Sequence, residues 1–137
     1  LHTGRYGFSE KCVAPSPITA PINFYRPKEL THEEILQTIE DYARCAKLAK
    51  MAGYDGVEIM GSEGYLINQF ITKCTNQRTD EWGGEYENRI RFPLKIVKRV
   101  KDKRAEEILC KACNKYVTSA NMKRHIQSAR HQRAITK

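Results

Sequence analysis

The stretch THEEILQTIEDYARCAKLAKMAGYDGVEIM, residues 31–60, decides the fold, because it predicts a capped helix that leads into a strand. Thr31 and Glu34 have the spacing of a capping box, in which each side chain bonds the backbone amide of the other residue. Apolar residues then recur every three or four positions, which predicts one helix over about 31–52. The β-branched run Val57–Met60 follows closely, so we predict a strand there and an α/β fold.

The segments on both sides of this unit are predicted from their turn formers and their periodicity. Gly53 has the expected place of a left-handed residue that ends the first helix. Leu1–Tyr25 is rich in Gly and Pro and indicates a loop, and residues 61–84 read as a long polar excursion after the strand. Tyr86–Lys101 has the pattern of a second helix, in which Pro93 predicts a kink or a restart.

Composition and charge limit the class of protein. The chain has 137 residues, of which 40% are hydrophobic and 29% charged, as is typical of a soluble globular protein. No apolar run approaches the ~20 residues that span a bilayer, and we recognise no signal peptide. Residues 1–102 carry 15 basic and 14 acidic side chains, whereas residues 103–137 carry nine basic and two acidic ones. This asymmetry predicts two modules with different partners.

Several short motifs occur in order along residues 1–102. Together they resemble the flavin-dependent old yellow enzyme family, and most closely its NADPH-dependent 2,4-dienoyl-CoA reductases. The motifs are His2-Thr3-Gly4-Arg5, the run AGYDGVEI at 52–59, the run GYLINQF at 64–70, the run NQRTDEWGG at 76–84, and Glu87-Asn88-Arg89.

The resemblance implies a (β/α)8 barrel with FMN at the C-terminal mouth of its strands, and hydride transfer from the flavin to an activated C=C of an enoyl or dienoyl thioester. Tyr65 would be the proton donor, and Glu63 would orient Tyr65 or tune its pKa. The substrate would contact the run Cys74, Thr75, Asn76 and Gln77. The family usually has arginine where Cys74 stands, and a neutral thiol does not bind an anion as a forked cation does. The family also usually has serine at the position of Glu85.

Simpler roles remain open for these residues. Tyr65 can be a packed aromatic residue beside a barrel wall, and Glu63 can be a surface carboxylate. Residues 1–102 supply about two of the eight repeats of a barrel, which takes ~250 residues. We therefore expect an incomplete barrel that does not by itself form an FMN site or turn over substrate.

Residues 108–131 have the spacing C-x2-C-x11-H-x5-H and resemble a two-Cys two-His zinc finger with ββα order. The predicted zinc ligands are Cys110, Cys113, His125 and His131, since thiolates and imidazoles are the ligands that zinc prefers. The gap between the second Cys and the first His is one residue shorter than the usual ~12. The alternative is a pair of cysteines on a turn before a basic amphipathic helix.

The basic residues of this second module form a candidate nucleic-acid interface, because cations attract phosphates. They are Lys123, Arg124, Arg130 and Arg133. A solvated basic face is the simpler alternative. We therefore carry two hypotheses, a piece of a flavin-dependent oxidoreductase and a zinc-dependent binding module that carries a barrel segment. Five cysteines without a visible signal sequence indicate a reducing intracellular compartment, in the first instance the cytoplasm.

Overall fold

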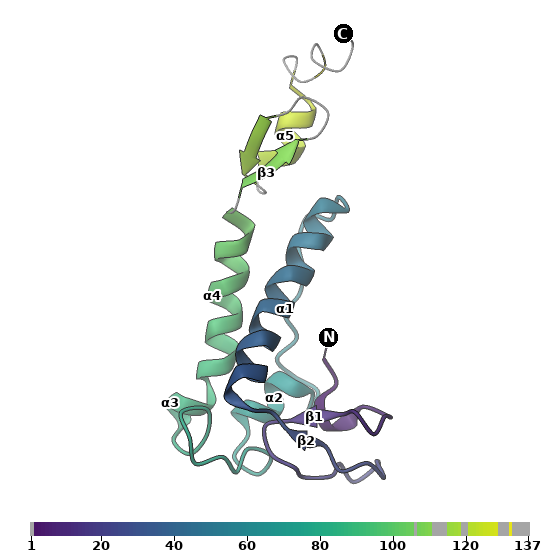
Figure 1. Ribbon diagram of the computed structural model, residues 1–137, viewed down its shortest axis with the longest axis vertical. Helices are drawn as coiled ribbons and strands as arrows, with labels where there is room; N and C mark the ends of the chain where they lie inside the picture. Colours follow the sequence, from purple (N-terminus) through teal and green to yellow (C-terminus); the bar gives the residue numbers. More distant parts are fainter. Residues whose placement is uncertain (1, 106, 111–114, 119–120, 129–131, 133–137) are drawn as a thin grey trace. The chain divides into compact units, whose positions relative to one another are not determined.

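The computed structural model describes residues 2–105, 107–110, 115–118, 121–128 and 132 (Figure 1). The chain divides into two compact units, unit 1 with Leu1–Glu40 and Glu58–Val97, and unit 2 with Asp41–Val57 and Lys98–Lys137. The elements are, in order, η1 (Gly4–Tyr6), β1 (Val13–Ala14), β2 (Lys28–Glu29), α1 (His32–Met51), α2 (Leu66–Ile71), α3 (Tyr86–Arg89), α4 (Arg91–Ala105), β3 (Glu107–Cys110), β4 (Lys115–Thr118) and α5 (Met122–Ile126). The boundary predicted between residues 102 and 103 thus falls inside α4.

Helix α1 begins and ends as its sequence predicts. The backbone amide of Thr31 donates to Oε2 of Glu34 at 2.9 Å, and the amide of Glu34 donates to Oγ1 of Thr31 at 3.2 Å. These two bonds form the predicted capping box and satisfy amides that have no partner inside the helix. Gly53 has a φ of +97°, so the glycine adopts the left-handed conformation predicted after the helix.

The second predicted helix is interrupted, and Pro93 explains where. Helix α3 ends at Arg89 and α4 restarts at Arg91. Proline has no backbone N–H, so Pro93 cannot donate to the carbonyl of Arg89 four residues earlier. The break at Ile90 places Pro93 in the first turn of α4, where a missing donor costs little, and the predicted restart is confirmed.

The strand predicted at Val57–Met60 is wrong. These four residues are described, and none of them belongs to a strand. Unit 1 has only a two-residue parallel pair among its described residues, in which Val13 of β1 faces Lys28 of β2 and Ala14 faces Glu29. A strand exists only through hydrogen bonds to a neighbour, and no described segment supplies a neighbour to Val57–Met60.

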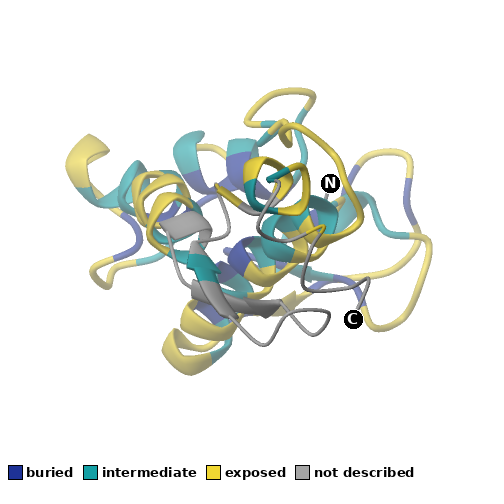
Figure 2. Ribbon diagram, turned by 90° about the horizontal axis from the view of Figure 1, so that it is seen from above, coloured by how far each residue is buried: buried dark blue, intermediate teal, exposed yellow. Residues whose placement is uncertain are grey.

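The core of unit 1 comes largely from the segment that we predict as polar. Residues 61–84 include helix α2, whose Leu66, Ile67 and Phe70 are at most 2% exposed, and the fully buried Trp82. The predicted polar excursion therefore also contains a helix and several buried apolar residues of the core. Buried residues are dark blue in Figure 2. The Phe70 ring stacks on that of Phe92 at the start of α4, with centroids 4.1 Å apart.

Unit 2 is described from its helices and from one hairpin. Strands β3 and β4 pair antiparallel, with Cys110 facing Lys115, and α5 follows them. Lys123 of α5 pairs with the carboxylate of Asp55.

Burial raises the pKa of Tyr42, in the second part of α1, to about 12. In the segments that the structure describes, no helix is both long and apolar enough to cross a membrane.

Candidate active site

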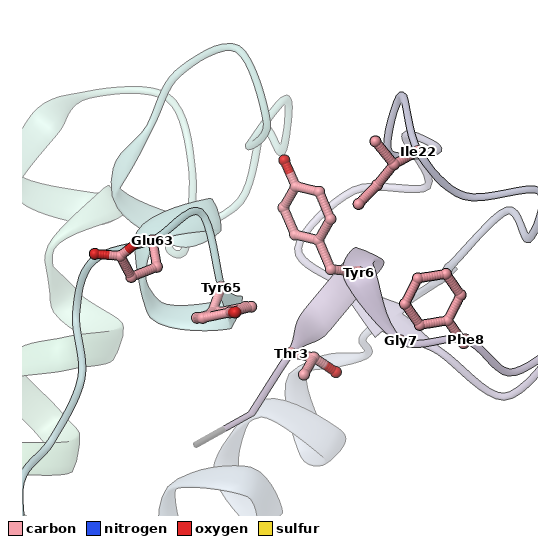
Figure 3. Close-up of a pocket in the computed structure, with 7 residues that line it drawn as sticks. All are labelled: Thr3, Tyr6, Gly7, Phe8, Ile22, Glu63 and Tyr65. Carbon is pink, nitrogen blue, oxygen red and sulfur yellow. The ribbon is translucent and has the colours of Figure 1, made fainter.

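An open hollow of about 530 Å³ lies in unit 1 between the first turn of the chain and the loop that precedes α2 (Figure 3). Both predicted catalytic residues line it. The lining residues are Thr3, Tyr6, Gly7, Phe8, Ile22, Glu63 and Tyr65. Apart from the one carboxylate, this lining is apolar, aromatic or neutral, which suits an apolar organic ligand.

Tyr65 is held at the wall of the hollow by the residues around it. It directly precedes α2, in extended backbone, and it follows Glu63 and Gly64, which both have positive φ values of 62° and 71°. The ring of Tyr6 meets the ring of Tyr65 edge to face, with centroids 6.3 Å apart and planes at 86°. A Cβ atom on Gly64 would lie 3.1 Å from Cε2 of Tyr6, so Tyr6 packs closely on this loop.

The buried side chain of Gln69 joins the two walls of the hollow. Its Nε2 donates to the carbonyl oxygens of Thr3 at 3.1 Å and of Gly64 at 2.7 Å. Its Oε1 accepts from the backbone amide of Arg5 at 3.1 Å. Gln69 is 1% exposed, and these three bonds satisfy its buried side-chain amide. They fix the loop that carries Tyr65 against the segment that carries Tyr6.

Gly4 makes room for this connection. Gly4 has a φ of +59°, and a Cβ atom there would lie 2.2 Å from Oε1 of Gln69, which is a clash. The adjacent backbone is tied as well, because the amide of Leu66 donates to the carbonyl of His2 at 3.0 Å. Sequence reasoning did not assign a role to Gln69. The signal that could have indicated its role was the position of a glutamine beside the apolar face of α2, because a buried amide needs hydrogen-bond partners.

The two predicted catalytic side chains share the hollow without bonding each other. Among the described residues, no hydrogen bond joins the carboxylate of Glu63 to the hydroxyl of Tyr65, and Figure 3 shows this carboxylate directed away from the Tyr65 ring. Glu63 is exposed, whereas Tyr65 is partly buried. The structure therefore assigns the two residues to one site but not to one hydrogen-bonded pair.

The four residues predicted to contact substrate do not line this hollow. Thr75 is 9% exposed, and its hydroxyl lies 2.8 Å from the carbonyl of Gln69. Asn76 is 2% exposed and donates to the carbonyls of Phe70 at 2.7 Å and Trp82 at 2.8 Å. These side chains satisfy buried backbone groups, so in this structure their role is to hold the loop together.

The other two of these four residues, Cys74 and Gln77, are exposed. The backbone amide of Gln77 donates to Oγ of Ser16 at 2.9 Å.

Arg78 anchors the following part of the loop. Its side chain is 6% exposed and donates to the backbone carbonyls of Pro15 at 3.0 Å and Leu30 at 2.7 Å. The guanidinium also pairs with the carboxylate of Asp80 at 2.5 Å and of Glu29 at 3.2 Å. The hydrogen bond from Arg78 holds the pKa of Asp80 below its ordinary value. Charged partners and carbonyls together compensate the burial of this cation.

The predicted zinc ligands lie partly outside the described residues. Cys110 belongs to β3 and His125 to α5, whereas Cys113 and His131 are not described. Within the described segments, no three His, Cys, Asp or Glu side chains are grouped as a metal site requires.

Of the predicted nucleic-acid contacts, only two are described. Lys123 and Arg124 of α5 are exposed, whereas Arg130 and Arg133 lie outside the described residues. A hollow of about 330 Å³ in unit 2 is lined in part by Arg124 and His125. The ion pair of Lys123 with Asp55 gives this lysine a partner within the chain.

The chain belongs to the NADH:flavin oxidoreductase / NADH oxidase family, whose pattern matches residues 3–132. It is 46% identical to the metal reductase of Desulforamulus reducens over 103 residues, which cover 72% of this chain and 15% of that protein. It is 45% identical to the NADPH dehydrogenase of Clostridium acetobutylicum over 103 residues, 74% of this chain and 30% of that protein.

Solved structures agree with this assignment. Morphinone reductase superposes with a TM-score of 0.70 at 35% identity, over 74% of this chain and 33% of that one. The old yellow enzyme homologue from Zymomonas mobilis superposes with a TM-score of 0.70 at 38% identity, over 74% of this chain and 32% of that one. The predicted resemblance to the old yellow enzyme family is confirmed. These neighbours are (β/α)8 barrels, and the chain spans 15% to 30% of the length of the two curated relatives above.

The residues that line this hollow lack a cation that would bind the phosphate of FMN, the cofactor of this family. None of the seven residues that line the hollow is a lysine or an arginine, so the hollow offers no cation to a phosphate. Apart from the carboxylate of Glu63 the lining is uncharged, and three of its seven residues are aromatic, which suits contact with an organic ligand.

Proposed function

We propose that this chain contributes the substrate-facing wall and the proton donor to an FMN-dependent oxidoreductase that reduces a C=C bond next to a carbonyl. Membership of the flavin oxidoreductase family supports the type of reaction. The observation that carries the proposal is the position of Tyr65, at the wall of the hollow and in edge-to-face contact with Tyr6. Of the possible substrates, we propose an enoyl or dienoyl thioester.

In the proposed reaction, the main contribution of this chain is a proton donor held in position. Reduction of an activated C=C adds a hydride, which FMN supplies when bound, to the carbon remote from the carbonyl. The displaced electron pair then takes a proton at the carbon next to the carbonyl. A neutral phenol donates such a proton effectively when it is held within hydrogen-bond reach, and water restores the phenol afterwards. Tyr65 fits this role because Gln69 and Tyr6 fix its loop.

A chimeric enzyme tests this assignment. Residues 2–102 of this chain would replace the matching segment of the NADPH dehydrogenase of Clostridium acetobutylicum, to which the chain is 45% identical over 103 residues. We expect the chimera to reduce an enoyl thioester with NADPH, and Tyr65→Phe to lower kcat by about 100-fold or more, the usual worth of general acid catalysis.

Tyr86→Phe is the matched control, because Tyr86 is exposed at the start of α3 and does not line the hollow. Equal kcat values for Tyr65→Phe and the parent chimera would reject Tyr65 as the proton donor. Reduction of other enones but no thioester would reject only the choice of thioester.

A second candidate function rests on the order of elements in unit 2. Hairpin β3–β4 is followed by α5, which is the ββα order of the zinc-finger class. We propose that Cys110, Cys113, His125 and His131 bind one zinc ion. The basic residues Lys123, Arg124, Arg130 and Arg133 would then contact nucleic-acid phosphates. The family match through residue 132 includes most of this segment and favours the first function.

Metal analysis tests the second candidate. We expect one zinc per chain after purification without chelator, and loss of that zinc in Cys110→Ser. Cys45→Ser is the matched control, because Cys45 is an exposed cysteine outside the motif. If zinc binds, affinity for duplex or single-stranded nucleic acid should fall steeply with salt, since phosphate contacts release counterions. A purified chain without zinc, or equal zinc contents in the two variants, would reject the metal site.

A further inference from the structure

The backbone of Glu63 is unusual for its residue type. Among the described residues, Glu63 is the one non-glycine residue with positive φ, at 62°, and every other residue with positive φ is a glycine. Side chains with a Cβ atom lose free energy in this conformation, which glycine adopts readily. Within the described part of the chain, Glu63 makes no hydrogen bond or ion pair that would compensate the loss. A role in a site is therefore a reason to keep a side chain here.

Glu63 differs from the other lining residues in its charge. It is the single formally charged residue among the seven that line the hollow. The guanidinium carbon of Arg5 lies 5.5 Å from the centre of the Tyr6 ring, but Arg5 itself is not part of the lining. The chain as a whole carries a net charge of +8. The formal charge of the lining residues is therefore negative, whereas the net charge of the chain is positive.

We infer that Glu63 determines charge specificity, so that the hollow binds apolar ligands with an uncharged or cationic head and rejects carboxylates. This inference rests on the proposed function only in taking the hollow as the substrate site. A conjugated thioester, ketone, aldehyde or amide presents an uncharged carbonyl, whereas a free enoic acid presents an anion at pH 7. The carboxylate of Glu63 repels such an anion, and the apolar side chains of Phe8 and Ile22 offer it no counter-charge.

Binding of three probes of matched shape tests the inference on the full chain. The probes are trans-cinnamamide (neutral), trans-cinnamate (anionic) and cinnamyltrimethylammonium (cationic), titrated into labelled protein while the backbone amides of Gly64 and Leu66 are followed by NMR. We expect the cation to bind about threefold tighter, and the anion about threefold weaker, than the amide. One unit charge at roughly 6 Å in water changes an affinity by about this factor. The differences should shrink in high salt.

Three variants separate the effect of the Glu63 charge on ligand preference from the effect of its backbone conformation on stability. Glu63→Gln should remove the preference for the cation, and the net positive charge of the chain should then favour cinnamate slightly. Glu63→Gly should remove the preference as well and also raise Tm, because glycine suits the left-handed backbone. Glu10→Gln is the control, since Glu10 is exposed, lies in unit 1 and does not line the hollow, and it should leave the ranking unchanged.

The inference is overturned if cinnamate binds as well as cinnamamide, if Glu63→Gln keeps the original ranking, or if no probe shifts the amides beside the hollow. Its outcome is separate from that of the proposed reaction. A chimera whose kcat is indifferent to Tyr65→Phe would reject the proton donor, whereas the ranking of the three probes would still hold.

Discussion

Two apolar stretches close together in the sequence have opposite outcomes in the structure. Leu66–Phe70 forms most of α2, and its Leu66, Ile67 and Phe70 are almost completely buried. Val57–Met60 also has three apolar residues but forms no strand, and Val57 is 47% exposed. A helix satisfies its backbone within its own segment, whereas a strand needs a second strand beside it. The local sequence is therefore sufficient to determine the helix at Leu66–Phe70, but it is not sufficient to determine a strand at Val57–Met60.

Buried side-chain amides provide hydrogen bonds in unit 1 where no strand pairing does. Gln69 and Asn76 are buried in unit 1 and bond backbone groups far from themselves in the sequence or across a turn. They replace, for irregular segments, the backbone pairing that a sheet would provide. Unit 1 is thus held by buried side-chain hydrogen bonds where strand pairing is short.

The largest expected effect contrasts the two apolar stretches directly. Phe70→Ala should lower the free energy of unfolding by about 3–5 kcal/mol, because it removes a fully buried ring stacked on Phe92. Val57→Ala should change it by less than ~0.5 kcal/mol, because Val57 is half exposed. Urea unfolding of both variants measures the difference. A loss for Val57→Ala comparable to that for Phe70→Ala would mean that Val57 is buried in solution and that the comparison fails.

Gln69→Ala tests the connection between the walls of the hollow. It should lower the free energy of unfolding by roughly 2–3 kcal/mol, because the carbonyls of Thr3 and Gly64 and the amide of Arg5 lose their partner. Hydrogen exchange of the Arg5 amide should become faster. Asn68→Ala is the control on the same helix, where Asn68 is only partly buried. Equal exchange rates in the two variants would contradict the role of Gln69.

Asp80→Asn tests the ion pair of Arg78 through pH. The hydrogen bond from Arg78 lowers the pKa of Asp80 from its ordinary value of 3.8, so the unfolded chain binds the proton first as pH falls. The stabilisation is therefore present above about pH 4 and is lost as pH falls through the lower pKa of the folded state.

We expect Asp80→Asn to cost about 1 kcal/mol at pH 7, a modest value because the Asp80 side chain is 42% exposed. The difference from the parent should disappear in strong acid, as measured by unfolding at several pH values. A difference that stays constant with pH would contradict this account.

The smallest expected effect concerns the start of α1. Thr31→Ala should lower the free energy of unfolding by about 0.5–1 kcal/mol, because the amide of Glu34 loses its acceptor. Thr31→Ser keeps the hydroxyl and should be close to the parent in thermal unfolding. If serine and alanine are equivalent, the capping bond contributes nothing measurable.

Local signals in the sequence were sufficient to predict where helices begin, end or are interrupted. The capping box at Thr31, the left-handed Gly53 and the interruption near Pro93 are all confirmed, because each depends on residues within one turn of the chain. The family was recognisable as well, since its motifs are contiguous, and Tyr65 and Glu63 do line one hollow.

The features of the fold and of the site that the sequence did not predict depend on contacts between distant segments. Nothing near Gln69 in the sequence indicates that it bonds Thr3, 66 positions away. Thr75 and Asn76 look like polar ligands in a polar loop, yet they are buried and bond carbonyls of the preceding turn and of Trp82. The absent strand at Val57–Met60 has the same cause, because its pairing cannot be decided from its own residues.

The chain contains one tryptophan, Trp82, which is fully buried and donates from Nε1 to Nδ1 of His32 at 3.1 Å. Intrinsic fluorescence therefore reports a single place, the packing of the 76–84 loop on the first residue of α1. Its emission should be blue-shifted in the folded chain and should move to longer wavelength when this contact opens. The molecule thus provides an unlabelled optical probe that responds to unit 1 alone.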